Sequence, residues 1–193
     1  MKRQFITFIL PAVLLLSSCA GKTTTSQQIK EGPTAEQENM IENGWSFNTP
    51  KGGDLGSNYG LTSIYVTQDN YFYIRIGEGF SVAIKIVDAD SDKCIRYVYV
   101  PENETVTIDQ IPQGRYYLKL AYGKDWMETT NDGFTQGKFT RSPFYEKSTS
   151  SYDFGKKNSQ SFVNDLLEIN VIDGSAENSF ETMSITEEEF DKN

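Results

Sequence analysis

Aromatic side chains between Tyr122 and Gly155 are the residues in this sequence best suited to binding chemistry. They are interleaved with Gly, Ser, Thr, Asn and Lys, a composition typical of loops. Aromatic rings on loops can stack on sugars or on other flat apolar groups. Large aromatics also dominate protein cores, so packing inward at one end of the domain is their commoner role. If this segment forms a binding surface, we expect the surface to contain Trp126, Phe134 and Tyr145.

The sequence contains no recognisable set of catalytic residues. The chain contains no histidine, which excludes Ser-His-Asp and Cys-His catalysis and histidine-based zinc sites. Aspartates occupy every second position of Asp88–Asp92, as at the start of a calcium-binding loop. However, Lys93 and Tyr99 stand at the positions where an EF-hand requires Gly and Glu. A hairpin turn is the better interpretation. We predict a non-enzymatic protein with no cofactor or metal, and a hydrolase using two carboxylates is the weaker alternative.

The N-terminal residues have the order of an export signal. Lys2 and Arg3 precede the apolar run Phe5–Leu16, and two serines then lead to Cys19. A positive start, a short apolar core and a small-residue cleavage zone describe a secretory signal. The run is shorter than the roughly 20 residues of a transmembrane helix. We therefore expect residues 1–18 to be a signal peptide.

The sequence Leu16-Ser17-Ser18-Cys19 resembles the lipobox of bacterial lipoproteins. The resemblance implies diacylglycerol on the Cys19 thiol, cleavage before Cys19 and acylation of the new amino group. Stable anchoring requires two or more such chains. In that family an Asp after the lipidated Cys favours the inner membrane, and here that position is Ala20. The resemblance therefore implies a cell-envelope protein in the outer membrane. Residues 21–25 lack the acidic run of a surface-export tag, which favours the periplasmic leaflet over the cell surface.

Charge and cysteine content limit the partners. Loss of residues 1–18 would change the net charge from −9 to −11. Nucleic acids and anionic lipid headgroups require a positive face, so we expect neither as a partner. With Cys19 lipidated, Cys94 has no disulfide partner, and we expect it to be a small buried hydrophobe.

The chain divides into a polar segment and a region of short alternating runs. Residues 19–44 predict a flexible tether with a helix near residues 35–41. From residue 45 to residue 193, apolar residues recur at every second position between turn signals, which predicts an all-β antiparallel sandwich. The expected strands are Leu61–Thr67, Tyr71–Gly77, Phe80–Val87, Cys94–Val100, Thr105–Asp109, Arg115–Tyr122 and Leu166–Ile172.

The segment Thr105–Leu120 resembles the hairpin of carboxypeptidase-regulatory-like, or transthyretin-like, β-sandwich modules. The resemblance implies a sandwich module, and such modules are usually non-catalytic. Its turn residues fit the physics, because Pro presets φ and Gly permits positive φ. The residues that carry the resemblance are Ile111, Pro112, Gly114, Tyr116 and Leu118.

Two functions remain open at the level of sequence. The leading hypothesis is a non-catalytic, lipid-anchored envelope protein that binds a ligand or assembles with protein partners. The alternative is a carbohydrate-binding lipoprotein that uses the aromatic residues of 122–155.

Overall fold

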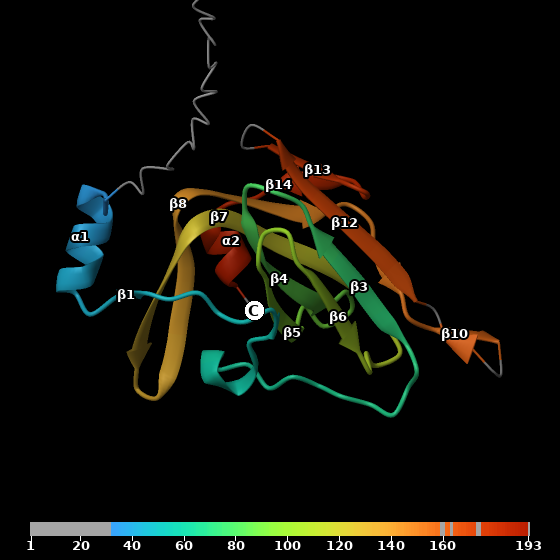
Figure 1. Ribbon diagram of the computed structural model, residues 1–193. Coiled ribbons are helices and arrows are strands. Elements are labelled where there is room, and N and C mark those ends of the chain that lie inside the picture. The colour runs from blue at the N-terminus through green and yellow to red at the C-terminus, as the bar shows by residue number, and fades with distance from the viewer. Residues whose placement is uncertain (1–31, 159–160, 163, 173–174, 193) are drawn as a thin grey trace, which may run out of the picture. The chain divides into compact units, whose positions relative to one another are not determined.

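Two β-sheets make up most of the folded part of the chain, residues 33–193, in the computed structural model (Figure 1). The structure describes residues 32–158, 161–162, 164–172 and 175–192. The predicted signal peptide, Cys19 and the tether up to residue 31 lie outside the described residues. No helix in the described part of the chain is long and apolar enough to span a membrane.

The larger sheet has eight strands, and every strand pair in it is antiparallel. Two of the eight, β1 (Ser46–Phe47) and β9 (Tyr152–Asp153), lie off the main order and pair with β7. The main order is β14 (Thr182–Ser184), β8 (Phe134–Ser148), β7 (Arg115–Asn131), β4 (Ser81–Asp88), β5 (Cys94–Val100) and β2 (Gly53–Asp54).

The smaller sheet has four strands and covers the inner face of the larger one. Its order is β13 (Ser175–Asn178), β12 (Asp165–Ile172), β3 (Tyr71–Ile76) and β6 (Thr105–Asp109). Strands β12 and β3 run parallel, and the other pairs are antiparallel. Strands β10 (Lys156–Asn158) and β11 (Ser161–Phe162) form a separate hairpin. The predicted all-β sandwich is confirmed, with one parallel pair in an otherwise antiparallel fold.

The core lies between the two sheets, where the alternating residues meet. Side chains at every second position of β3, β4 and β7 are buried there, as the sequence pattern predicted. Burying one such side chain contributes about 1.5–3 kcal/mol. The main members are Phe72, Ile74, Ile76, Val82, Ile84, Ile86, Tyr116, Leu118, Leu120 and Tyr122.

The strand expected at Leu61–Thr67 is absent from the structure, and this segment is a loop. Its backbone hydrogen bonds go to different parts of the fold. Ile64 N–H donates to the carbonyl of Ile95 in β5, and Val66 N–H donates to the carbonyl of Gln110, which follows β6. Because no single neighbouring strand accepts these bonds in turn, the alternating sequence does not form a ladder.

Two short helices and a 3₁₀ turn pack against the sheets. Helix α1 (Ala35–Glu42) begins with a capping box, in which Thr34 and Gln37 each satisfy the other's backbone N–H. The buried Gln37 amide donates to Asp125 at 3.1 Å and to Thr140 at 2.9 Å, which fixes the helix against β7 and β8. The folded unit therefore begins at residue 33, and the last part of the expected 19–44 tether belongs to it. Turn η1 (Gly56–Tyr59) and helix α2 (Glu187–Asp191) pack on the larger sheet.

Candidate binding surface

Most aromatic residues of 122–155 pack inward. Some join the core between the two sheets: Tyr122, Phe144, Tyr152 and Phe154. Others join a second hydrophobic cluster: Trp126, Phe139 and Tyr145. Trp126 is 4% exposed and packs edge-on against Tyr99 and Phe139, with ring centroids 5.3 and 4.8 Å away. Its indole N–H donates to Glu128 at 2.8 Å. Trp126 therefore packs inward, which is the alternative to ligand binding that the sequence analysis described.

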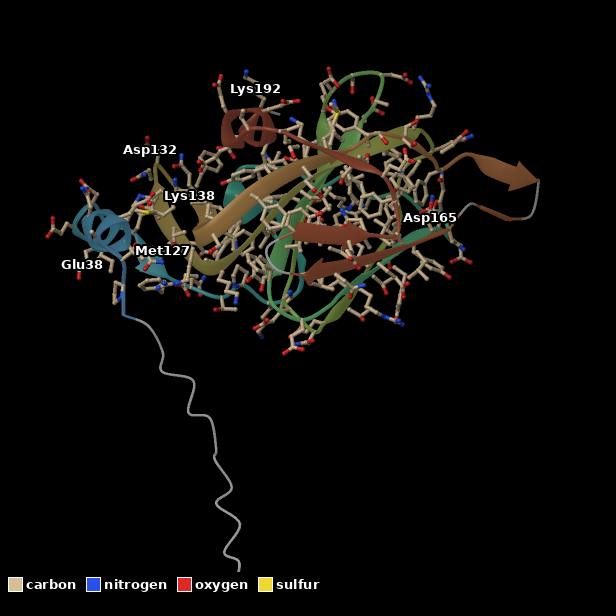
Figure 2. All side chains as sticks on the ribbon, turned by 90° about the horizontal axis from the view of Figure 1, so that it is seen from above. Glu38, Met127, Asp132, Lys138, Asp165 and Lys192 are labelled. Atoms are coloured by element: carbon tan, nitrogen blue, oxygen red, sulfur yellow. The ribbon has the colours of Figure 1, made fainter. Side chains whose placement is uncertain are left out.

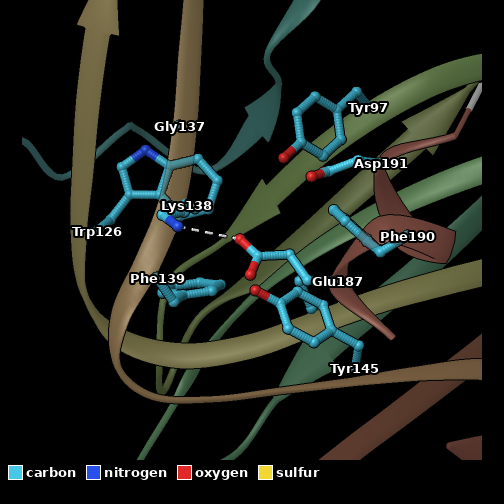
Figure 3. Close-up of a pocket in the computed structure, with 10 residues that line it drawn as sticks. Tyr97, Trp126, Gly137, Lys138, Phe139, Tyr145, Glu187, Phe190 and Asp191 are labelled. Carbon is cyan, nitrogen blue, oxygen red and sulfur yellow. Dashed lines mark hydrogen bonds and ion pairs between the residues drawn. The ribbon is translucent and has the colours of Figure 1, made fainter. Parts of the chain in front are cut away.

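The other two predicted residues lie apart from each other. Phe134 is 55% exposed, near Gly60, at the turn end of the β7–β8 ribbon. Tyr145 is partly buried against Phe190 of α2, with ring centroids 5.6 Å apart. Tyr145 and Trp126 both line a recess beneath α2 (Figure 3). Its volume is about 10 Å³, roughly the space of one water molecule, so the recess has no room for a ligand.

Helix α2 is held over this face by two lysines from the sheet. Lys119 Nζ donates to the carbonyl oxygens of Glu189 and Lys192 at 2.7 and 2.6 Å. Lys85 Nζ donates to the carbonyl of Asp191 at 3.2 Å, and burial lowers its pKa. Cations at a helix C-terminus complement the helix dipole and satisfy its unpaired carbonyls. The outer face of the larger sheet is therefore covered here by the chain itself.

The Asp88–Asp92 segment is a hairpin turn whose carboxylates serve separate partners. Asp88 accepts hydrogen bonds from the Ser91 hydroxyl at 2.7 Å and its backbone N–H at 2.8 Å, and the hydroxyl bond lowers the Asp88 pKa. Asp90 pairs with Arg115 at 2.6 Å. Within the described part of the chain, no group of three or more His, Cys, Asp or Glu side chains could hold a metal ion.

Cys94 is partly buried beside the covered face. Its thiol donates to the carbonyl of Arg96 at 3.1 Å, and burial raises the thiol pKa to about 11. Since the thiolate is the reactive form, this cysteine is unreactive near neutral pH.

A hollow of about 300 Å³ lies on the outer face of the smaller sheet. Strand β3 alternates strictly, so Phe72 and Ile74 point into the core while the intervening tyrosines face outward. Tyr71 is 39% exposed. The lining residues are Tyr71, Tyr73, Asn164, Asp165 and Leu166.

The strand register places polar groups on both sides of the tyrosines. On β6, Asp109 lies opposite Tyr71 and Thr107 lies opposite Tyr73. Residues opposite each other in adjacent strands have Cβ atoms about 4.5–5.5 Å apart on the same face. On the other side, the Asn164 side-chain oxygen accepts from the Tyr71 backbone N–H at 3.0 Å, which fixes the amide beside that ring.

An ion pair closes one end of this surface. Arg75 follows the two tyrosines on the same face, and its guanidinium donates to Glu168 of β12 at 3.0 Å. We name the surface formed by Tyr71, Tyr73 and their outward neighbours on β6 and β12 the tyrosine face. The larger sheet is covered on both faces around β4, but the tyrosine face is open to solvent.

Comparisons with family models, curated proteins and solved structures find no match to this chain. The likeness of residues 105–120 to transthyretin-like modules therefore stays a prediction. In the structure β6 and β7 do not pair as a hairpin but lie in different sheets. Functional assignment rests on the geometry of the described residues.

The tyrosine face combines flat apolar rings with hydrogen-bonding groups. Aromatic rings can stack on flat ligands, and Asp, Asn and Thr side chains bond hydroxyl or amine groups. A hollow of 300 Å³ is at the small end of the range for ligand sites, so it fits part of a longer ligand. Alternation in the sequence already placed Tyr71, Tyr73 and Arg75 together, but the flanking groups depend on strand pairing that the sequence does not reveal.

Proposed function

We propose that this protein is a non-catalytic, lipid-anchored protein of the cell envelope that binds a glycan on its tyrosine face. One observation carries the proposal. Tyr71 and Tyr73 stand two residues apart on one strand and line an open hollow together with Asn164 and Asp165.

The geometry suits a long, ring-containing ligand. Alternate residues on a strand are about 6.6–6.8 Å apart, so one extended chain can contact both rings. The apolar face of a sugar ring can stack on tyrosine, while its hydroxyls bond to the carboxylate, amide and hydroxyl groups alongside. Strand β3 lies between β12 and β6, so the rings are carried by a paired strand and need little ordering on binding.

The sequence supports the remaining parts of the proposal. The lack of histidine removes the most common hydrolytic machinery, which favours binding without turnover. The lipobox at Cys19 supports a lipid anchor, and the chain between that residue and Pro33 supplies the connection to the folded unit. Labelled palmitate should enter the wild-type protein and should fail to enter Cys19→Ser.

Glycan binding is tested with the full-length protein in detergent on a glycan array, followed by affinity measurements for the best ligand. We expect Tyr71→Ala and Tyr73→Ala each to weaken binding roughly 2- to 10-fold, because one aromatic contact is worth about 0.5–1.5 kcal/mol. Phe134→Ala is the matched control, since it removes an exposed aromatic ring from a different surface and should leave affinity unchanged. Absence of binding to every glycan, or full affinity in both tyrosine variants, would overturn the proposal.

A further inference from the structure

We propose that the tyrosine face selects glycans by charge, with amine-bearing sugars bound more tightly than neutral sugars and acidic sugars bound least. This inference rests on the proposed glycan-binding function and names the ligand class of the same surface.

The strands that carry the tyrosine face are rich in acids. Arg75 is the sole basic residue in the sequences of β3, β6, β12 and β13, and Glu168 already pairs with it at 3.0 Å. The acidic residues of these strands are Asp109, Asp165, Glu168 and Glu177.

One of these acids borders the tyrosine rings on their own face. Asp109 is exposed and lies directly across from Tyr71. Asp165 also lines the hollow, but it pairs with the buried Phe72, so its side chain lies on the opposite face of the sheet.

Arg96 on β5 of the larger sheet interacts electrostatically with Asp109. That guanidinium is fully buried and lies 3.4 Å from Asp54, so a ligand on the tyrosine face cannot reach it.

An amine on a sugar ring would meet favourable groups on two sides. The face of a tyrosine ring attracts cations, and a carboxylate accepts a charge-assisted hydrogen bond from an ammonium group. A uronate or sulfate would meet the same carboxylate as a like charge. The negative net charge, −11 after loss of residues 1–18, adds a weaker repulsion from the rest of the chain.

The expected selectivity is moderate because the surface is exposed. One charge pair about 7 Å apart in water changes an affinity roughly threefold. The Asp109 carboxylate, attracting one ligand charge and repelling the other, therefore predicts roughly a 5- to 10-fold difference between amine-bearing and acidic sugars at low salt. The difference should shrink at about 1 M salt, where the Debye length falls to about 3 Å.

The test compares three oligosaccharides of equal length with the full-length protein: glucosamine, N-acetylglucosamine and galacturonic acid oligomers. The pH is mildly acidic, so that the amine of the glucosamine oligomer is protonated. We expect affinity to fall in that order. Asp109→Asn should reduce the preference for the amine-bearing oligomer roughly threefold.

Asp132→Asn is the matched control, because it makes the same charge change in the exposed turn of the β7–β8 ribbon. Figure 2 shows Asp132 at the opposite end of the folded unit from Asp165. Equal or tighter binding of the acidic oligomer would overturn the charge selection, as would an equal effect of Asp132→Asn and Asp109→Asn. Failure of all three oligomers and of every other glycan would overturn the proposed function itself.

Discussion

Tyrosine has two distinct roles in this molecule, and burial separates them. Tyr97, Tyr99 and Tyr122 are less than 10% exposed and pack against other aromatic rings. Tyr71 and Tyr73 sit on an open sheet face instead, where their rings meet no core. The same residue type therefore stabilises the fold at one set of positions and offers a stacking surface at another.

The pKa of Tyr116 makes the stability of the fold depend on pH. Its hydroxyl donates to the carbonyl of Pro112 at 2.9 Å, closing the turn before β7, and burial raises its pKa from 10.0 to about 12. Because the folded-state pKa lies above the unfolded value, the resulting stability is fully present below pH 10 and is lost as pH rises toward 12.

We therefore predict a phenolate absorbance transition near pH 12 that is present in the wild-type protein and missing from Tyr116→Phe. The measurement is a difference titration of the two proteins. A transition of this residue near pH 10 in the folded protein would contradict the assigned burial.

At the scale of elements, alternation predicted each face of β3 correctly, because both neighbours of this strand lie in one regular sheet. Alternation did not predict the full length of β7, which was expected to end at Tyr122 and instead continues to Asn131. A register shift between Tyr122 and Lys124, with Asp125 at φ 53°, reverses the alternation there. The parallel pairing of β12 with β3 also has no local sequence signal, so the full tyrosine face could not be assembled from sequence alone.

Glycines in the β7–β8 ribbon make room for its aromatic rings. A Cβ atom at Gly137 would overlap the indole of Trp126 across the strand pair. We predict that Gly137→Ala lowers the free energy of unfolding by about 1–3 kcal/mol, because an added methyl group in a packed site forces side chains from their positions. Urea unfolding followed by tryptophan fluorescence measures the change.

Gln136→Ala is the control for this prediction, since Gln136 is the exposed neighbour on the same strand. Its effect should stay within about 0.5 kcal/mol. Equal stability of Gly137→Ala and the wild type would show that Trp126 does not occupy the space above Gly137.

At the scale of the whole molecule, the two sheets differ in how they are covered. Strand β4 is buried on both faces, because the smaller sheet covers one face and α2 with the neighbouring loops covers the other. The smaller sheet has one covered face and one open face. The tyrosine face is therefore an open sheet face that carries aromatic rings and lines a hollow, which makes it the surface we propose for a ligand.

The central claim is that a glycan binds on this face and not on the ribbon. The most direct measurement is a nuclear magnetic resonance titration of the full-length protein in detergent with its best glycan ligand. We predict that signals of Tyr71, Tyr73 and Thr107 shift together with a single affinity, while those of Phe134 stay in place. Shifts at Phe134 with none at the two tyrosines would contradict the account.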